Sequence, residues 1–358
     1  MNILVFGNGL VFTFSHERVL AQSLAELGHK VWLVQSPPFL IDMGKWDFHK
    51  NLTIIEIPYS KYNSNSLLLE EKMDLVLGAN HTVAHFVADY KDKHNCLGIC
   101  NFLEFPVHMI NGKDTVNYNF DYSQKFYYWL NCALDLDAVI FNTSVSCEEF
   151  EKRYRRKAHL VYSSNIGKYD YNYFSAIDKP SSDYIFSCHK LVQSKGTDYL
   201  LMAIKKLGID YKHVYGLSMK EHKMNIEAMA SNMDPKVSFY PYASERKKME
   251  LCYHCNLVVY PQILEWIAGQ SIIDGFSMKK PGVVFDYPIY KELYGDCVLY
   301  AERRSVVDLR GKIKELYFDK DMNREMGERA YQRYLDNFTP KIMAERILDV
   351  ANQYITCD

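Results

Sequence analysis

The sequence predicts an α/β protein made of two doubly wound domains, each a mostly parallel sheet with helices on both faces. The chain has 358 residues, which is more than one hydrophobic core usually serves. Short apolar strands alternate with amphipathic helices through the first half, and a strand, loop and helix begin again near residue 184. In sheets of this kind, ligands bind beyond the carboxyl ends of the strands.

The composition is that of an ordinary soluble protein, with 48% hydrophobic and 24% charged residues. A net charge of −2 argues against a nucleic-acid-binding surface, which usually shows a basic excess. The chain opens on an apolar run without a basic stretch before it, and no later run is long enough to span a bilayer. We therefore expect a cytoplasmic protein with reduced cysteines, and the lone Cys252/Cys255 pair lacks the second half of a zinc site.

In the first half, the expected strands cover residues 2–6, 30–35, 54–57, 74–77, 97–101 and 138–142. A helix over residues 15–27 follows the first strand and ends at Gly28. The glycine-rich turn at residues 7–12 invites a dinucleotide interpretation. That interpretation fails because Phe12 stands where the motif needs a small residue, and because no ribose-binding acid follows the second strand. We therefore expect no NAD(P).

The second half is organised around residues 257–286. A strand at 257–260, a loop, a glycine-bearing turn, a helix from about Gln270 and a buried strand at 282–285 follow one another. Glu265 stands before the turn and Asp274 lies inside the first helical turns, with Gly269 between them. Backbone N–H groups at such a helix start favour a phosphate, which leaves the acids to bind hydroxyls. The alternative is an ordinary helix edge with solvated or capping acids.

This stretch resembles the signature segment of retaining GT-B glycosyltransferases of the family 4 type (glycosyl transferases group 1), E-G-F-G-L-P-x-x-E followed by a helix and K-P-V-V. Glu265 corresponds to the first acid, Gly269 to the second glycine and Asp274 to the second acid. One extra residue separates the two acids, and aspartate replaces the second glutamate. Residues 184–196 resemble the family's G-R-L-x-x-x-K-G, with Lys190 at the arginine position and Lys195 at the lysine position.

Other segments extend the resemblance over most of the chain. Residues 213–216 resemble the strand and glycine that border the nucleobase, and residues 237–245 resemble V-x-F-x-G-x-V-S with Pro241 in place of the glycine. Tyr242 then borders the base, although a core aromatic is an equal interpretation. Residues 132–142 and 160–174 resemble the end of the first domain and the linker strand. The polar stretch 176–183 after them predicts the hinge.

The resemblance implies a GT-B fold, with two doubly wound Rossmann-like domains facing across a cleft. We expect an acceptor-side domain at residues 1–168, a donor-side domain at 169–338 and a C-terminal helix at 339–358 that crosses back to the first domain. The implied reaction moves a sugar from a nucleotide diphosphate sugar to a hydroxyl of a glycan, lipid-linked or small-molecule acceptor, with retention of configuration. Two lysines and a helix terminus supply positive charge, and no D-x-D triad is evident, so neither a metal nor another cofactor is expected.

The resemblance also assigns roles to residues. The candidate catalytic residues are Lys190 and Lys195, which hold the diphosphate, and Glu265, which binds the transferred sugar; solvated lysines are the alternative interpretation. The candidate donor-binding residues are Gly9, Gly216, Tyr242, Gly269, Gln270, Ser271, Ile272 and Asp274, the last of them on the ribose. His81 and Glu104 follow strand ends and are candidates for the acceptor side, against the simpler interpretation of a surface histidine and a capping acid.

Two other hypotheses remain open. A sugar-nucleotide epimerase or a phosphorylase is compatible with the same fold, because fold does not determine chemistry. A non-catalytic protein that binds sugar nucleotides or glycans is compatible with the displaced Glu265 and with Lys190 in place of arginine. A small basic cluster suggests contact with an anionic membrane carrying a lipid-linked acceptor, or else a solvated helix end. The cluster consists of Arg153, Arg155, Arg156 and Lys157.

Overall fold

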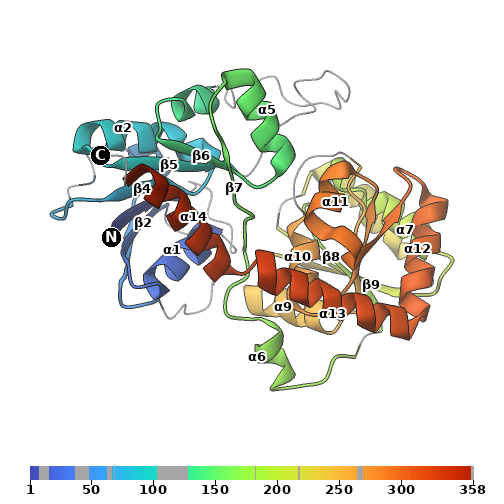
Figure 1. Ribbon diagram of the computed structural model, residues 1–358. Helices are drawn as coiled ribbons and strands as arrows, with labels where there is room; N and C mark the ends of the chain where they lie inside the picture. Colours follow the sequence, from blue (N-terminus) through green and yellow to red (C-terminus); the bar gives the residue numbers. More distant parts are fainter. Residues whose placement is uncertain are drawn as a thin grey trace. The chain divides into compact units, whose positions relative to one another are not determined.

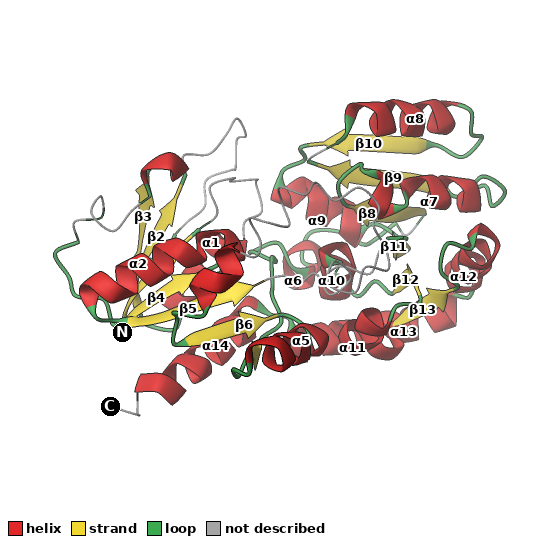
Figure 2. Ribbon diagram, turned by 90° about the horizontal axis from the view of Figure 1, so that it is seen from above, coloured by secondary structure: helices red, strands yellow, loops and turns green. Residues whose placement is uncertain are grey.

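The computed structural model describes residues 1–7, 16–36, 48–62, 67, 69–102, 128–181, 183–216, 218–263 and 269–355. The chain divides into two compact units. The first comprises Met1–Asn165 and Phe338–Asp358, and the second comprises Ile166–Asn337 (Figure 1). Taken by itself, each unit consists of strands with helices packed around them (Figure 2).

Within the described residues, the first unit has a seven-stranded parallel sheet in the order β3-β2-β1-β4-β5-β6-β7. The order changes direction between β1 and β4, as in other doubly wound sheets. The strands are β1 (Asn2–Phe6), β2 (Lys30–Gln35), β3 (Leu52–Glu56), β4 (Leu75–Gly78), β5 (Leu97–Phe102), β6 (Ala138–Phe141) and β7 (His159–Leu160).

Helices cover both faces of this sheet. On one face, α1 (His16–Glu26) packs beside α14 (Pro340–Ile355) (Figure 1). Apolar side chains of both helices join the same core. The other face is covered by α2 (Ala84–His94) and α5 (Ser144–Tyr154). The end of the chain therefore belongs to the first unit. Two short 3-10 turns, η1 (Tyr59–Lys61) and η3 (His81–Val83), complete the named elements of this unit.

The second unit has a six-stranded parallel sheet, counted over its described residues, in the order β10-β9-β8-β11-β12-β13. Its strands are β8 (Tyr184–Cys188), β9 (Asp210–Tyr215), β10 (Val237–Pro241), β11 (Leu257–Tyr260), β12 (Gly282–Phe285) and β13 (Val298–Ala301). Here the order changes direction between β8 and β11. Both sheets confirm the predicted α/β class with two doubly wound, Rossmann-like units.

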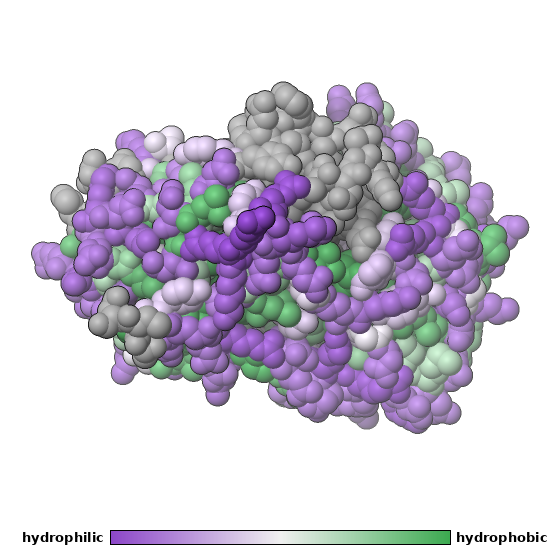
Figure 3. All heavy atoms as spheres, turned by 45° about the horizontal axis from the view of Figure 1, so that its top comes forward, coloured by the Kyte–Doolittle hydropathy of each residue, from purple (hydrophilic) through white to green (hydrophobic). Residues whose placement is uncertain are grey.

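The helices of the second unit follow its strands in the expected alternation. They are α6 (Tyr171–Ser175), α7 (Thr197–Ile204), α8 (Lys220–Ser231), α9 (Glu245–Tyr253), α10 (Gln270–Ser277), α11 (Pro288–Tyr294), α12 (Val306–Phe318) and α13 (Lys320–Asn337), with 3-10 turns η4 (Gln193–Lys195) and η5 (Gly295–Cys297). Hydrophilic residues cover most of the described surface on the face drawn in Figure 3. No helix in the described part of the chain is long and apolar enough to cross a membrane.

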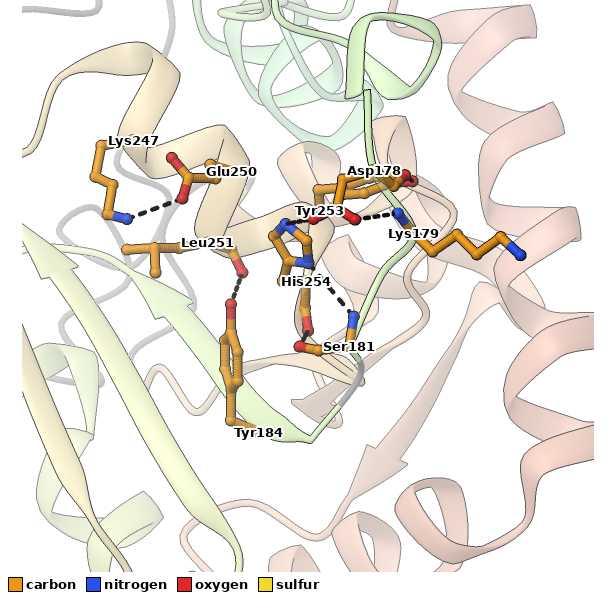
Figure 4. A network of polar contacts seen from close by, with 9 residues as sticks. All are labelled: Asp178, Lys179, Ser181, Tyr184, Lys247, Glu250, Leu251, Tyr253 and His254. Carbon is orange, nitrogen blue, oxygen red and sulfur yellow. Dashed lines mark hydrogen bonds and ion pairs between the residues drawn. The ribbon is translucent and has the colours of Figure 1, made fainter. Parts of the chain in front are cut away.

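The polar segment 176–183 is tied to the end of α9 (Figure 4). The Tyr253 hydroxyl donates to the Asp178 carbonyl over 2.7 Å, and the Ser181 N–H donates to Nδ1 of His254 over 3.3 Å. Next to this segment, the Tyr184 hydroxyl donates to the carbonyl of Leu251 over 2.8 Å. The segment therefore belongs to the second unit, whose boundary lies at residues 165/166. The predicted hinge at 176–183 was wrong, because polar, proline-containing composition marks an exposed loop whether or not it joins two domains.

The basic cluster after α5 is partly structural. Arg155 caps the C-terminal end of α5 and has a left-handed backbone with φ +50°. The next residue, Arg156, donates to the carbonyl of Ala133 over 3.2 Å and also to that of Leu134. Since its guanidinium group is occupied by these carbonyls, Arg156 holds two segments of the first unit together. Arg153 and Arg155 are exposed.

Candidate functional site

The candidate site lies at the carboxyl ends of β8 and β11, where the strand order of the second unit changes direction. The loops that follow these two strands are joined by a backbone hydrogen bond, in which the Ile263 N–H donates to the Ser194 carbonyl over 3.0 Å. Doubly wound sheets bind their ligands in the crevice outside the carboxyl ends of the strands at such points.

Gly196 determines the path of the loop after β8. Its φ is +66°, in the left-handed region that favours glycine. A Cβ atom added here would stand 2.0 Å from the Pro261 carbonyl oxygen, so the two loops touch only because this residue has no side chain. Gly196 ends the 3-10 turn η4 and starts α7, and thereby determines the position of the preceding residue, Lys195.

Lys195 is half-buried and reaches across to the end of β11. Its Nζ donates to the Tyr260 hydroxyl over 2.8 Å and to Oε1 of Gln262 over 2.6 Å. The same ammonium group lies 5.2 Å from the centre of the Tyr260 ring. By contrast, Lys190 is exposed. The structure therefore brings one of the two predicted lysines into a polar cluster with Tyr260 and Gln262, which the sequence analysis had missed although both stand at a strand end.

Two buried histidines support the start of this loop. Nε2 of His213, on β9, and the carbonyl of His189 lie 2.9 Å apart, and the ring nitrogen donates this bond. Burial lowers the pKa of His213 to about 4. Burial also holds the pKa of His189 well below its usual range, and the nearby His213 and Lys195 add to the effect. Both imidazoles are therefore neutral near pH 7.

Gly269, at the start of α10, is enclosed by tyrosines. Its N–H donates to the Tyr294 hydroxyl over 2.6 Å, and a Cβ atom here would stand 2.4 Å from the Tyr260 ring. Among the residues at the start of α10 that were predicted to bind a phosphate, Ile272 already donates its N–H to the Gly269 carbonyl over 2.9 Å. The role of Gln270 and Ser271 as N–H donors to a phosphate at this helix terminus stays a prediction.

Asp274, in the second turn of α10, forms a buried ion pair with a residue of α9. Its Oδ2 lies 2.9 Å from Nζ of Lys248, and the two side chains are only 3% and 4% exposed. Burial by itself lowers the pKa of Lys248, but the charge and hydrogen bond of Asp274, together with the nearby Cys188 and Glu245, outweigh burial, so the pKa is raised. The sequence alone did not lead us to Lys248. The pattern that could have identified it is a charged residue on the otherwise apolar face of an amphipathic helix.

The predicted base-binding residues follow neighbouring strands. Gly216 follows β9 and has open space where a Cβ atom would stand. Tyr242 follows β10 and is 51% exposed as a residue, and its N–H donates to the Tyr215 carbonyl over 2.7 Å. Tyr242 has a φ of +51°, an uncommon conformation for a residue with a side chain. The exposure of Tyr242 argues against the core-aromatic interpretation, and contact with a base stays a prediction.

Three of the predicted residues, Gly9, Glu104 and Glu265, lie outside the described residues. His81, in the first unit, follows β4 and is 4% exposed. Its ring centre lies 5.2 Å from that of Trp129, and burial lowers its pKa to about 4. The surface interpretation of His81 was therefore wrong, while its role towards an acceptor stays a prediction. Among the residues that the structure describes, no group of three or more His, Cys, Asp or Glu side chains is arranged to hold a metal ion.

Comparison with known proteins gives a family match within the second unit. Residues 173–333 match the family described as glycosyl transferases group 1. An uncharacterised glycosyltransferase of Methanocaldococcus jannaschii is 22% identical over 298 residues, which are 78% of this chain and 79% of the relative.

Solved structures of proteins from several organisms have similar folds. Sucrose-phosphate synthase from Thermosynechococcus elongatus has a TM-score of 0.78 at 14% identity, with all of both chains covered. A glycosyltransferase from Rickettsia africae has a TM-score of 0.72 at 16% identity, covering 100% of this chain and 99% of the other. The HepE protein of Anabaena, solved with UDP and glucose, has a TM-score of 0.72 at 13% identity, covering 98% and 99%. Within the second unit, residues 173–333 are therefore similar to the glycosyl transferases group 1 family, and the chain has the fold of GT-B glycosyltransferases.

Proposed function

We propose that this protein transfers a sugar from a nucleotide diphosphate sugar to an acceptor hydroxyl, with retention of configuration and without a metal ion. The observation that carries the proposal is the Lys195 cluster at the carboxyl ends of β8 and β11. The family match over residues 173–333 supports it. The HepE protein of Anabaena has been solved with UDP-glucose, so a uridine diphosphate sugar is the first donor to test.

In this proposal, Lys195 acts on the leaving group. The bond between the anomeric carbon and the diphosphate oxygen breaks, and negative charge grows on the diphosphate. An ammonium group held in place by Tyr260 and Gln262 stabilises that charge without having to reorganise first. The N-terminus of α10, at Gln270 and Ser271, adds its positive dipole end.

The remaining roles follow from the resemblance to the family. Glu265 binds hydroxyls of the transferred sugar, and Asp274 binds the ribose. The acceptor oxygen forms the new bond to the anomeric carbon on the face that the diphosphate leaves, and the acceptor proton passes to a phosphate oxygen of the leaving group. Two cationic elements, a lysine and a helix terminus, take the place that a divalent metal holds in metal-dependent transferases.

A binding screen tests the proposal before any acceptor is known. The purified chain is heated with UDP, GDP, dTDP, ADP or CMP and with their common sugars, each with and without EDTA, and hits are measured again by calorimetry. A ligand that binds the folded state raises the melting temperature by mass action. We expect one diphosphate series to stabilise the protein equally with and without EDTA, and the nucleoside diphosphate to be released from the matching sugar nucleotide.

Other outcomes separate the competing hypotheses. Stabilisation by free glycans alone, with no nucleotide bound, would identify a glycan-binding protein. Release of an epimerised sugar nucleotide without any acceptor would identify an epimerase. Loss of binding in EDTA would contradict the metal-independent mechanism. Nuclear magnetic resonance of the first transfer product reports whether the anomeric configuration of the donor is retained.

A further inference from the structure

The buried face of α9 carries charges where an amphipathic helix normally carries apolar side chains. Four buried residues, at positions 245, 248, 249 and 252, lie on one face of the helix, and two of them are Glu245 and Lys248. Lys248 pairs with Asp274 at 2.9 Å, with both side chains almost fully buried. Buried ion pairs contribute little net stability, because both partners lose their hydration. This pair therefore calls for a reason other than stability.

The bonding of Asp274 supplies that reason. Its Oδ2 is held by Lys248, whereas Oδ1 is buried and has no hydrogen-bond partner among the described residues. Ser271 lies three residues earlier on α10, and its Oγ is also buried without a partner in the described part of the chain. A carboxylate oxygen in such surroundings is costly unless a donor meets it. Since no donor meets Oδ1 among the described residues, a water molecule and a hydroxyl group of a ligand are the two donors to test.

We propose that Lys248 is a positioning residue of the donor site, which anchors the Asp274 carboxylate through Oδ2 so that Oδ1 accepts a hydrogen bond from a ribose hydroxyl. This inference rests on the proposed function, in which Asp274 binds the ribose. Lys248 acts through Asp274 and does not touch the ligand. Because an aspartate side chain is short, anchoring one of its oxygens also restricts the position of the other.

The test compares nucleotides with and without ribose hydroxyls. The affinities of the whole chain for UDP, GDP and ADP, and for the 2′,3′-dideoxy form of each, are measured by calorimetry. For the base that binds, the wild type is expected to prefer the ribonucleotide by about tenfold or more, since hydrogen bonds to charged groups are strong. Lys248→Met is expected to reduce this preference to less than about threefold, mainly by lowering the affinity for the ribonucleotide. Lys248→Arg is expected to restore most of it.

A neighbouring lysine provides the matched control. Lys247 is on the same helix and pairs with Glu250 at 3.0 Å, with both side chains about two-fifths exposed. Lys247→Met is expected to leave the ribose preference unchanged. If Lys248→Met folds and keeps the full preference, the inference is overturned, and a water molecule rather than ribose meets Oδ1.

Further variants cover a failure to fold. Should Lys248→Met be unfolded, Lys248→Gln keeps a neutral donor to Asp274 and is expected to retain only part of the preference. The double variant Lys248→Met/Asp274→Asn removes both charges of the ion pair and is expected to match Asp274→Asn alone in its ribose preference; a further loss would overturn the inference. A wild type that binds no nucleoside diphosphate contradicts the proposed function itself, whereas one that binds UDP without preferring its ribose contradicts only this inference.

Discussion

Two lysines of the second unit are held in opposite ways. Lys195 donates to two neutral oxygens, those of Tyr260 and Gln262, at 2.8 and 2.6 Å. By contrast, Nζ of Lys248 forms an ion pair with Oδ2 of Asp274 at 2.9 Å. Neutral oxygens orient an ammonium group without cancelling its charge, whereas a carboxylate compensates it. In the proposed function, Lys195 acts on the diphosphate and Lys248 orients the carboxylate of Asp274.

The largest expected effect comes from removing the charge of Lys195. Lys195→Met keeps the length of the side chain but removes the cation, and we expect the turnover of the donor to fall by about 100- to 1000-fold, as for other groups that stabilise developing charge. The melting temperature should change little. Release of nucleoside diphosphate from the donor identified in the binding screen measures the turnover.

The exposed lysine is the control for this variant. Lys190→Met is expected to reduce turnover by less than about tenfold, because solvent screens an exposed charge. Equal losses of turnover in the two variants would show that the hydrogen bonds to Tyr260 and Gln262 give Lys195 no advantage over Lys190.

The second-largest expected effect concerns the contact between Gly196 and the Pro261 carbonyl, which positions Lys195. Gly196→Ala must adopt a φ of +66° and bring a Cβ atom against the Pro261 carbonyl. We expect a loss of about 3 kcal/mol of folding free energy, from backbone strain and overpacking together. Gly208→Ala is the matched control, since Gly208 has a φ of +64° but nothing within 4 Å of the added atom. It should lose only about 1 kcal/mol, and similar melting temperatures for the two variants would rule out the contact as the cause.

Acid is expected to act on the Lys195 region through the buried histidine that supports its loop. The pKa of His213 is about 4 in the folded state, against 6.5 for an ordinary histidine. Between pH 6.5 and pH 4 the unfolded chain binds a proton that the folded chain does not, so stability falls as the pH drops through this window. The loss from His213 is at most about 3 kcal/mol.

Melting temperatures between pH 7 and pH 4.5 check this expectation. His213→Gln should give a shallower decrease than the wild type. The decrease should not vanish, because burial also lowers the pKa of His81 to about 4 in the first unit. A variant whose melting temperature falls as steeply as that of the wild type would contradict the assignment to His213.

The smallest expected effect concerns the hydrogen bond that anchors the start of α10, the helix that carries Asp274. Tyr294→Phe removes the hydroxyl that accepts the Gly269 N–H, and we expect a loss of about 1–2 kcal/mol in stability. Turnover should fall severalfold because the start of α10 shifts. Tyr300→Phe is the control, since its hydroxyl donates to the Gly295 carbonyl over 2.7 Å and makes no contact with Gly269. If turnover is equal in the two variants, the anchoring of Gly269 has no role in the site.

The sequence alone determined the layers of the fold. The expected strands at residues 2–6, 30–35, 257–260 and 282–285 coincide with β1, β2, β11 and β12, because a buried parallel strand is a local apolar run. The start of α14 at Pro340 was also predictable, since proline is favoured in the first helical turn. The motif at residues 190–196 located the loop that carries Lys195, because its glycine and lysine lie close together in the chain.

Only the tertiary structure decided which residues meet. Lys195 lies 65 residues before Tyr260, and Lys248 lies 26 residues before Asp274. The predicted position of the hinge was wrong for a related reason. The local composition of residues 176–183 does not indicate that this segment forms hydrogen bonds with the end of α9. Hydrophobic periodicity reports whether a side chain is buried, whereas the partner of a buried charge depends on how separate elements pack.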